Sequence, residues 1–456
     1  ALLGVPVVVV SSKTKQGVNE ILPTLARARA SEFEFPADAA ALELWADGVY
    51  ADVASSHDER DEDDRLTDRF DRAFTHPVVG VVLFAAIMTG LFWVIFLPQI
   101  VLLFFLIAVL EQTGYLARAA FVIDRLLRPF GLPGHAFVPL LSAHACAIPA
   151  IMSARAVPDR RDRLATILVI PFMSCSARIP VYVLLTQILF PGSSTKQALA
   201  FTMCYAIGIA AGLLSAILAR GTLLRGKSRP MALELPRYQL PSLVGATKQA
   251  LGRGWLFVRK AGTVILAISV VLWWLGAYPG SEPSPVAEGL REQAAVVAEA
   301  QPDDADELLA QADAEDTKYA ARRTFLGRIG ATAQPIFAPM GADRQLTVGI
   351  LASFAAREVF VSTMAVQIAG TDDTEDEGVL AAVSGATRDD GSLVFTPATS
   401  WAMLVFFVLA IQCLPTLVVT AKEAGGWKWA GLQFAWMSSL AYIAATLVYQ
   451  ILTRVV

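Results

Sequence analysis

Two segments within apolar stretches each combine a cysteine with hydroxyl side chains and proline. The first is residues 173–180 (MSCSARIP), and the second is residues 412–416 (QCLPT). Proline interrupts a helix, and at membrane depth the freed backbone groups must be satisfied by protein or by water in a cavity. Paired broken helices in the two halves of a transporter are typical of a substrate site near the membrane midplane. We therefore expect Cys175 and Cys413 to line one path; the simpler alternative is a proline kink with an incidental cysteine.

Charged residues interrupt two further apolar stretches. Glu111 and Arg118 lie seven residues apart, and Arg357 and Glu358 are adjacent within the stretch 345–368. A charged side chain at the centre of a span costs about 2.5–3.5 kcal/mol on insertion scales, so such residues are usually functional or paired. Both interpretations stay open here: the acids lie on a transport path, or each pair is an ion pair that locks helices together.

The donor atoms in these stretches favour a transition metal as the substrate. Thiols, a thioether, carboxylates, hydroxyls and an imidazole are available from Cys146, Cys175, Cys413, Met173, Glu111, Glu358, Ser174 and His144. Such a mixture suits iron(II), manganese, zinc or cobalt better than calcium or magnesium, which prefer oxygen ligands. Because the metal must also leave, we expect a sparse and weak site. The fourth cysteine, Cys204, has no polar company and is predicted to be a packing residue.

The whole chain has the composition of a membrane protein. Of its 456 residues, 55% are hydrophobic and 17% are charged. The apolar residues come in blocks of about 20 or more, the length that crosses a bilayer as a helix. We predict an all-α polytopic membrane protein with about eight transmembrane helices, at 78–97, 98–127, 164–190, 198–219, 258–278, 345–368, 401–420 and 431–453.

Basic residues orient these spans, because positive clusters prefer the cytoplasm. Arginines on both sides of residues 136–152 predict a re-entrant segment that carries His144 and Cys146 to membrane depth. The basic loop 220–260 is predicted to be cytoplasmic, and an even number of spans then places both termini there. The acidic loop 279–344 would lie outside, with a helical hairpin over residues 286–323.

The first 76 residues differ from the rest in character. A β-branched run, the turn Ser11-Ser12-Lys13 and a following helix resemble the last nucleotide-contact loop of Ras-like GTPases, although an ordinary strand–loop–helix fits equally well. No phosphate-binding loop accompanies this turn, so the chain alone is not expected to hydrolyse GTP. Residues 31–76 are predicted to be a helical linker, and the chain looks like the C-terminal part of something longer.

Four motif blocks follow one another in a defined order. They are residues 110–121 (LEQTGYLARAAF), the ordered block 146–182, residues 354–359 (FAAREV), and Cys413 with residues 423–429 (EAGGWKW). Together they resemble the FeoB family of bacterial ferrous iron importers, in which a GTPase domain is fused to a membrane domain with two Gate regions. The resemblance covers roughly residues 77–455 and implies one Gate region in 77–278 and another in 345–456, with residues 1–30 as the remnant of the GTPase domain.

The resemblance implies import of Fe²⁺ across the bacterial inner membrane, coupled to or gated by GTP, which binds with Mg²⁺ in the intact protein. It makes Cys175 and Cys413 gate cysteines and, with Glu358, metal ligands. Other path residues would be Cys146, Glu111, Ser174 and Met173, and the nucleotide site would retain Ser11, Ser12 and Lys13. Implied partners are the lipid bilayer, small cytoplasmic Feo proteins and further copies of the chain, but no nucleic acid.

Two other functions stay open at this point. A Gate-type carrier of an organic solute such as a nucleoside needs amide and aromatic groups at its broken helices, and Gln187 and Gln412 are thin support. A membrane-tethered signalling GTPase needs no polar groups at membrane depth, so Cys175, Glu358 and Cys413 argue against it.

Overall fold

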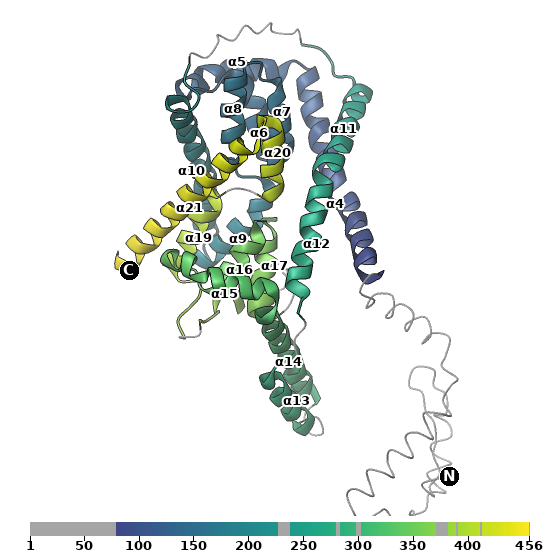
Figure 1. Cartoon of the computed structure of the whole chain (residues 1–456), viewed down its shortest axis with the longest axis vertical. Coiled ribbons are helices and arrows are strands. Elements are labelled where there is room, and N and C mark those ends of the chain that lie inside the picture. Colours follow the sequence, from purple (N-terminus) through teal and green to yellow (C-terminus); the bar gives the residue numbers. More distant parts are fainter. Residues whose placement is uncertain are drawn as a thin grey trace, which may run out of the picture. The chain divides into compact units, whose positions relative to one another are not determined.

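The computed structural model describes residues 79–226, 238–279, 283–297, 302–354, 356–370, 382–388, 391–410 and 413–455 (Figure 1). Within these residues the regular elements are helices, and an isolated bridge between Thr387 and Leu393 is the one β pairing, so the all-α prediction is confirmed for this part. The predicted GTPase remnant and linker lie outside the described residues. The chain divides into two units, Ala1–Ala86 and Ile87–Val456, and the site described below belongs to the second.

The helices of the first half carry the first Gate motifs. They are α4 Val79–Gln112, α5 Tyr115–Leu127, α6 Phe137–Ala143, α7 Ala147–Ser153, α8 Arg160–Val169, α9 Ile179–Leu189, α10 Ser194–Gly221, α11 Leu243–Phe257 and α12 Thr263–Ala277. Short 3₁₀ turns extend some of them, among them η4 Ile170–Phe172 and η5 Ser176–Arg178. A π-helical turn, η6 Val258–Gly262, joins α11 to α12.

The second half begins with two polar helices and returns to apolar ones. Its helices are α13 Pro285–Val297, α14 Pro302–Arg323, α15 Phe325–Phe337, α16 Arg344–Ser353, α17 Val359–Met364, α19 Pro397–Leu409, α20 Leu414–Ala424 and α21 Trp427–Val455. Apolar side chains fill two cores, one around α9, α16, α17 and α19 and the other around α6, α7 and α8. Cys204 lies in the first core, where its thiol donates to Ala200 O, so its predicted packing role is confirmed.

Fewer membrane spans are found among the described residues than the eight or so predicted from the sequence. Four segments are long and apolar enough to cross a membrane: Arg160–Leu189, Ser194–Gly221, Pro397–Ala424 and Trp427–Val455. A fifth span would be the pair Leu97–Gln112 and Tyr115–Phe130, which are bent by 83° relative to each other. The chain is therefore a multi-pass membrane protein with four or five candidate spans in the part that the structure describes.

Backbone chemistry explains where the predicted spans differ. Pro98 lies inside α4, because a proline can be accommodated in a long helix as a local kink, and the candidate span of this region begins at Leu97. The chain turns instead at Gly114, whose φ of 75° lies in the left-handed region that glycine adopts without strain. The predicted span 345–368 is interrupted, which leaves Val359–Ile368 as a short apolar helix.

The interrupted segments predicted in the first half are present. Residues 136–152 contain two seven-residue helices, α6 and α7, with residues 144–146 between them. The stretch 164–190 is broken between η4, which ends at Phe172, and η5, which begins at Ser176. Both interruptions carry a cysteine.

The polar helices α13 and α14 pack side by side as the hairpin predicted for residues 286–323 (Figure 1). Arg291 on α13 is paired with Asp313 at 2.8 Å and with Asp316 at 2.7 Å, both on α14. The backbone N–H of Ser284, just before α13, donates to Asp316 at 2.6 Å. Asp316 therefore joins the start of one helix to the middle of the other.

We expect this hairpin to loosen in acid through Asp316. The Ser284 N–H and then the Arg291 guanidinium hold the pKa of Asp316 below its ordinary value. A carboxyl group with a depressed folded pKa stabilises the fold above its unfolded pKa of about 3.9, and this contribution is lost as the pH falls through the folded pKa. Amide hydrogen exchange in α13, corrected for intrinsic pH dependence, should accelerate in acid more than in an Asp316→Asn variant. An identical acid response of both chains would contradict this role.

Candidate metal path

Four interruptions of helices surround one cavity of about 230 Å³. They lie between α6 and α7, between η4 and η5, between α16 and α17, and between α19 and α20. Each contributes one side chain that could bind a metal, namely Cys146, Cys175, Glu358 and Cys413 in turn. The sequence paired the broken helices around Cys175 and Cys413 and predicted the re-entrant segment that carries Cys146; the structure adds the interruption before Glu358.

These four side chains hold equivalent places in their segments. Each is the N-cap residue of the helical turn or helix that follows it, and none makes a side-chain capping hydrogen bond. The three cysteines have extended backbone, with φ of −157° at Cys146, −89° at Cys175 and −159° at Cys413. Since capping does not engage these side chains, their donor atoms can face the cavity.

Hydrogen bonds tie the two interruptions of the first half together. His144 Nδ1 lies 3.2 Å from Ser174 O, and the Ser176 hydroxyl donates to Ala145 O at 2.9 Å. Backbone carbonyls that leave a helix ladder at membrane depth need such donors. His144 is thus placed beside the cavity wall as a supporting residue, because its ring contacts the backbone of Ser174 and stacks on Tyr205.

Arg178 joins the first half to the second. Its side chain is fully buried, and its guanidinium donates to Val408 O and Ala410 O at 2.7 Å each and to Pro171 O at 3.2 Å. Val408 and Ala410 end α19, whereas Pro171 lies in η4. A planar fork of donors can satisfy several carbonyls at once, which a lysine cannot do with the same geometry. Arg178 therefore fixes the two broken helices relative to each other.

A backbone contact and a thiol contact order the interruptions of the second half. The N–H of Leu414, at the start of α20, donates to Phe354 O, at the end of α16, at 2.8 Å. Cys413 Sγ lies 3.0 Å from Thr416 Oγ1, one turn into α20. The third and fourth interruptions are thereby held side by side, as the first and second are.

The adjacent charges Arg357 and Glu358 are not paired with each other. Arg357 is 1% exposed, with Nη1 3.5 Å from Ser353 Oγ and the guanidinium over the rings of Phe354 and Phe407, at 5.5 and 5.2 Å. Glu358 is half-buried and, within the described ranges, forms no ion pair. The ion-pair alternative is therefore not supported, and the carboxylate is left at the cavity.

Two predicted path residues lie outside this lining. Ser174 is buried, and its hydroxyl is 3.0 Å from Tyr182 OH. Met173 is buried too, and its methyl group packs against Gly212 on α10. Both support the wall from behind. Conversely, the lining includes Gln99 on α4, which sequence reasoning missed although a polar residue beside Pro98 in an apolar helix was a usable signal.

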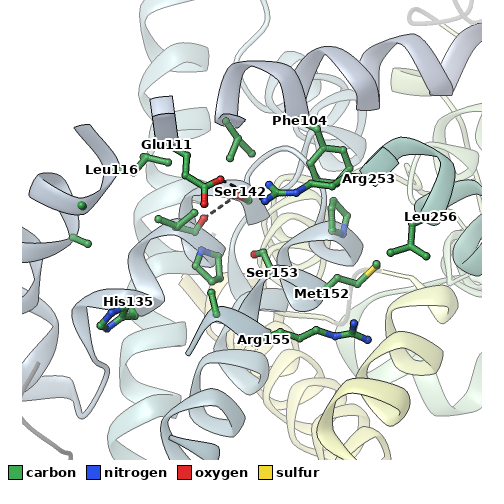
Figure 2. Close-up of a pocket in the computed structure, with 17 residues that line it drawn as sticks. Phe104, Glu111, Leu116, His135, Ser142, Met152, Ser153, Arg155, Arg253 and Leu256 are labelled. Atoms are coloured by element: carbon green, nitrogen blue, oxygen red, sulfur yellow. Dashed lines mark hydrogen bonds and ion pairs between the residues drawn. The ribbon is translucent and has the colours of Figure 1, made fainter. Parts of the chain in front are cut away.

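Glu111 lies at a different and larger cavity, of about 650 Å³ (Figure 2). There its carboxylate is 3.4 Å from Arg253 Nη2 on α11. Arg118 instead donates to Gly114 O and lies 3.6 Å over the ring of Tyr238. The proposed pairing of Glu111 with Arg118 is therefore wrong, and Glu111 is not a neighbour of the three cysteines in the smaller cavity.

No ready-made metal centre is found in the part of the chain that the structure describes, since no three His, Cys, Asp or Glu side chains converge there. Cys146, Cys175, Glu358 and Cys413 line the smaller cavity without meeting at one point. Donors spread in this way suit an ion that is passed along, because conduction requires binding weak enough for the ion to leave. We call the smaller cavity the thiol cavity.

Comparison with known families gives two matches. The model "Gate: Nucleoside recognition" matches residues 93–189 and 258–427, and the model "Ferrous iron transport protein B C terminus" matches residues 201–253. The first covers more than half of the chain and includes all four interruptions. The second covers most of α10 and α11.

Similar curated proteins carry names that agree with the second model. Fe(2+) transporter FeoB of Leptospira biflexa is 36% identical over 370 residues, which are 78% of this chain and 49% of that protein. Fe(2+) transporter FeoB of Campylobacter jejuni is 33% identical, over 77% of this chain and 52% of the relative. A Porphyromonas gingivalis protein, named as a fusion of Fe(2+) transport protein A and FeoB, is 34% identical over 78% and 42%. The chain spans about half the length of these relatives, and no solved structure matches it.

Proposed function

The chain belongs to the FeoB family, as its membrane region with Gate domains, and from this we propose that its broken helices form the route of Fe²⁺ across the bilayer. The observation that carries the proposal is the thiol cavity, where Cys146, Cys175, Glu358 and Cys413 come together from four interruptions. Sulfur and carboxylate donors spread along one cavity suit a borderline divalent metal that is passed between them. Such an ion can exchange part of its hydration shell for these ligands and regain it on leaving.

An organic solute fits the thiol cavity less well. The volume of the thiol cavity, about 230 Å³, lies below the roughly 300–1,000 Å³ usual for small-molecule pockets. Nucleoside recognition also needs several hydrogen-bonding groups, and most of the lining here is apolar apart from the metal-binding side chains and Gln99, Ser176, Arg357 and Thr416. Because the matching family model is described as "Gate: Nucleoside recognition", uptake of a nucleoside remains one outcome of the transport experiment below.

The proposal extends to the protein as a whole. Residues 1–30 would be the remnant of a GTPase domain and residues 31–76 its linker, with the termini in the cytoplasm of a bacterium and the hairpin in 279–344 outside. About eight crossings would satisfy this topology. GTP with Mg²⁺ would gate or drive the flux, and a small Feo protein would bind from the cytoplasm; the fused relative of Porphyromonas gingivalis supports such a partner.

Anaerobic Fe²⁺ influx into proteoliposomes tests the proposal. Three samples are compared. They are this chain, the chain joined to the N-terminal domain of a relative (the restored protein) without GTP, and the restored protein with GTP. We expect influx in the restored protein with GTP. Absence of Fe²⁺ influx in every sample that is folded by circular dichroism, with uptake of a labelled nucleoside instead, would replace iron by an organic solute.

A further inference from the structure

The two cavities described above share a wall. On three helices, neighbouring residues line different cavities, so that the cavities follow one another along α4, α7 and α11. The pairs are Leu103 and Phe104 on α4, Ile148 and Pro149 on α7, and Phe257 and Leu256 on α11, the first of each pair lining the thiol cavity. The thiol cavity thus continues toward the larger one, separated from it by these six side chains.

This shared wall is apolar, whereas both cavities have polar groups. The larger cavity contains Glu111, His135, Arg155 and Arg253 among its lining residues (Figure 2). An ion that leaves the thiol cavity in this direction must pass between side chains that carry no polar group. Apolar constrictions stop ions in channels because they exclude the water that an ion carries. The wall has the properties of a closed gate.

Helix α11 is held in this wall partly by contacts at the exposed side of the helix. Polar and exposed contacts fasten it and the residues before it to the bend between α4 and α5: Glu111 with Arg253 at 3.4 Å, Gln112 Oε1 with Ser242 N at 2.9 Å, and Arg118 over Tyr238 at 3.6 Å. Exposed ion pairs contribute little to stability, so the Glu111–Arg253 pair can open at small cost. The π-helical turn η6 directly follows α11, and such turns often occur at functional sites.

We infer that the larger cavity is the vestibule through which the cation leaves the thiol cavity, and that α11 is its gate. Leu256 and Phe257 close the passage while Arg253 is paired with Glu111. When α11 moves, Glu111 loses Arg253 and becomes the carboxylate that receives the hydrated divalent cation. This inference deepens the proposed function and depends on it, since it assumes a cation in the thiol cavity.

The charges around the vestibule agree with an exit. Arg155 in its wall is paired with Glu423, and Glu111 with Arg253, so the closed vestibule offers a cation no free carboxylate among these lining groups. Opening the pair between Glu111 and Arg253 leaves the Glu111 carboxylate free to bind a cation. Arginines 160, 161 and 163 follow the vestibule end of α7 in the sequence, and positive clusters prefer the cytoplasm, which makes this end the side of delivery.

Thiol labelling tests the gate separately from transport. The experiment uses inside-out vesicles of the restored protein that carry Cys204→Ser, and an impermeant methanethiosulfonate is applied to them. The reagent should modify the cysteines of the thiol cavity about two- to fivefold faster in Arg253→Gln than in the parent, because the exposed Glu111–Arg253 ion pair is lost. Leu256→Ala, at a partly exposed position, should do the same, because it shortens a side chain of the apolar wall. The controls are Lys248→Gln and Leu251→Ala, which lie on the same helix at exposed positions outside both linings.

Equal labelling rates in Arg253→Gln, Leu256→Ala and the parent would overturn the gate. Fe²⁺ leak without GTP is measured on the same vesicles and should rise in both variants. Faster labelling in these two variants, with no Fe²⁺ movement in any sample, would keep α11 as a gate and reject iron as the substrate. The two proposals therefore fail in different ways.

Discussion

Replacing Cys175 with serine is expected to lower ferrous influx at least roughly tenfold, since even the outer partners of a metal ligand change affinity 10- to 100-fold when removed. Cys175 is buried, lines the thiol cavity and makes no capping hydrogen bond, so its sulfur is available as a ligand. Serine fits the same space but removes the soft donor that favours iron(II). The measurement is initial influx into anaerobic proteoliposomes of the restored protein with GTP.

Cys204→Ser is the matched control for this variant. Cys204 is also buried, at 1% exposure, but it packs in the apolar core on α10 and does not line the thiol cavity. We expect it to transport like the parent at equal expression. Undiminished influx in Cys175→Ser, or an equal loss in both variants, would reject a specific role for the Cys175 thiol.

Replacing Arg178 with methionine is expected to destabilise the membrane domain by about 3 kcal/mol or more, at about 1 kcal/mol or more for each buried carbonyl that loses its donor. The carbonyls are those of Pro171, Val408 and Ala410, which the guanidinium joins across the two broken helices. Arg178→Lys should be intermediate, because an ammonium is a compact charge without the planar fork. Thermal unfolding in detergent measures both variants.

An exposed arginine provides the comparison. Arg225, which follows α10, donates from Nε to Gly221 O at the end of that helix, and Arg225→Met should change stability by less than about 0.5 kcal/mol. An Arg178→Met chain that unfolds at the same temperature as Arg225→Met would show that the link between η4 and α19 is not needed. A parallel loss of Fe²⁺ influx is expected in Arg178→Met at temperatures where the chain is folded.

Proline chemistry made the interruptions at Cys175 and Cys413 predictable, because proline next to polar residues in an apolar stretch is a local signal. The interruption before Glu358 has no such signal: residues 354–358 contain neither proline nor glycine. There the helix ends through a tertiary contact, in which Phe354 O accepts from Leu414 N. A contact between residues 60 positions apart cannot be read from local spacing.

Ion pairs were also hard to predict from local spacing. Glu111 and Arg118 lie on similar helical faces if one helix continues through both, and this spacing suggested an ion pair. The bend at Gly114 separates them, and Arg253, far along the chain, takes the place of Arg118. Pro98 shows that a proline need not end a helix, since α4 continues through it. Composition predicted the helical class, while long-range contacts decide the span count and the partners.

X-ray absorption at the iron edge, on the purified chain with one equivalent of Fe²⁺ under anaerobic conditions, tests the central claim most directly. If the ion binds in the thiol cavity, sulfur will be found in its first coordination sphere. That sulfur signal should disappear in the Cys175→Ser/Cys413→Ser double variant and persist in Cys204→Ser. A spectrum with oxygen and nitrogen neighbours alone, unchanged by the double variant, would show that Fe²⁺ does not use the thiols and would contradict the account.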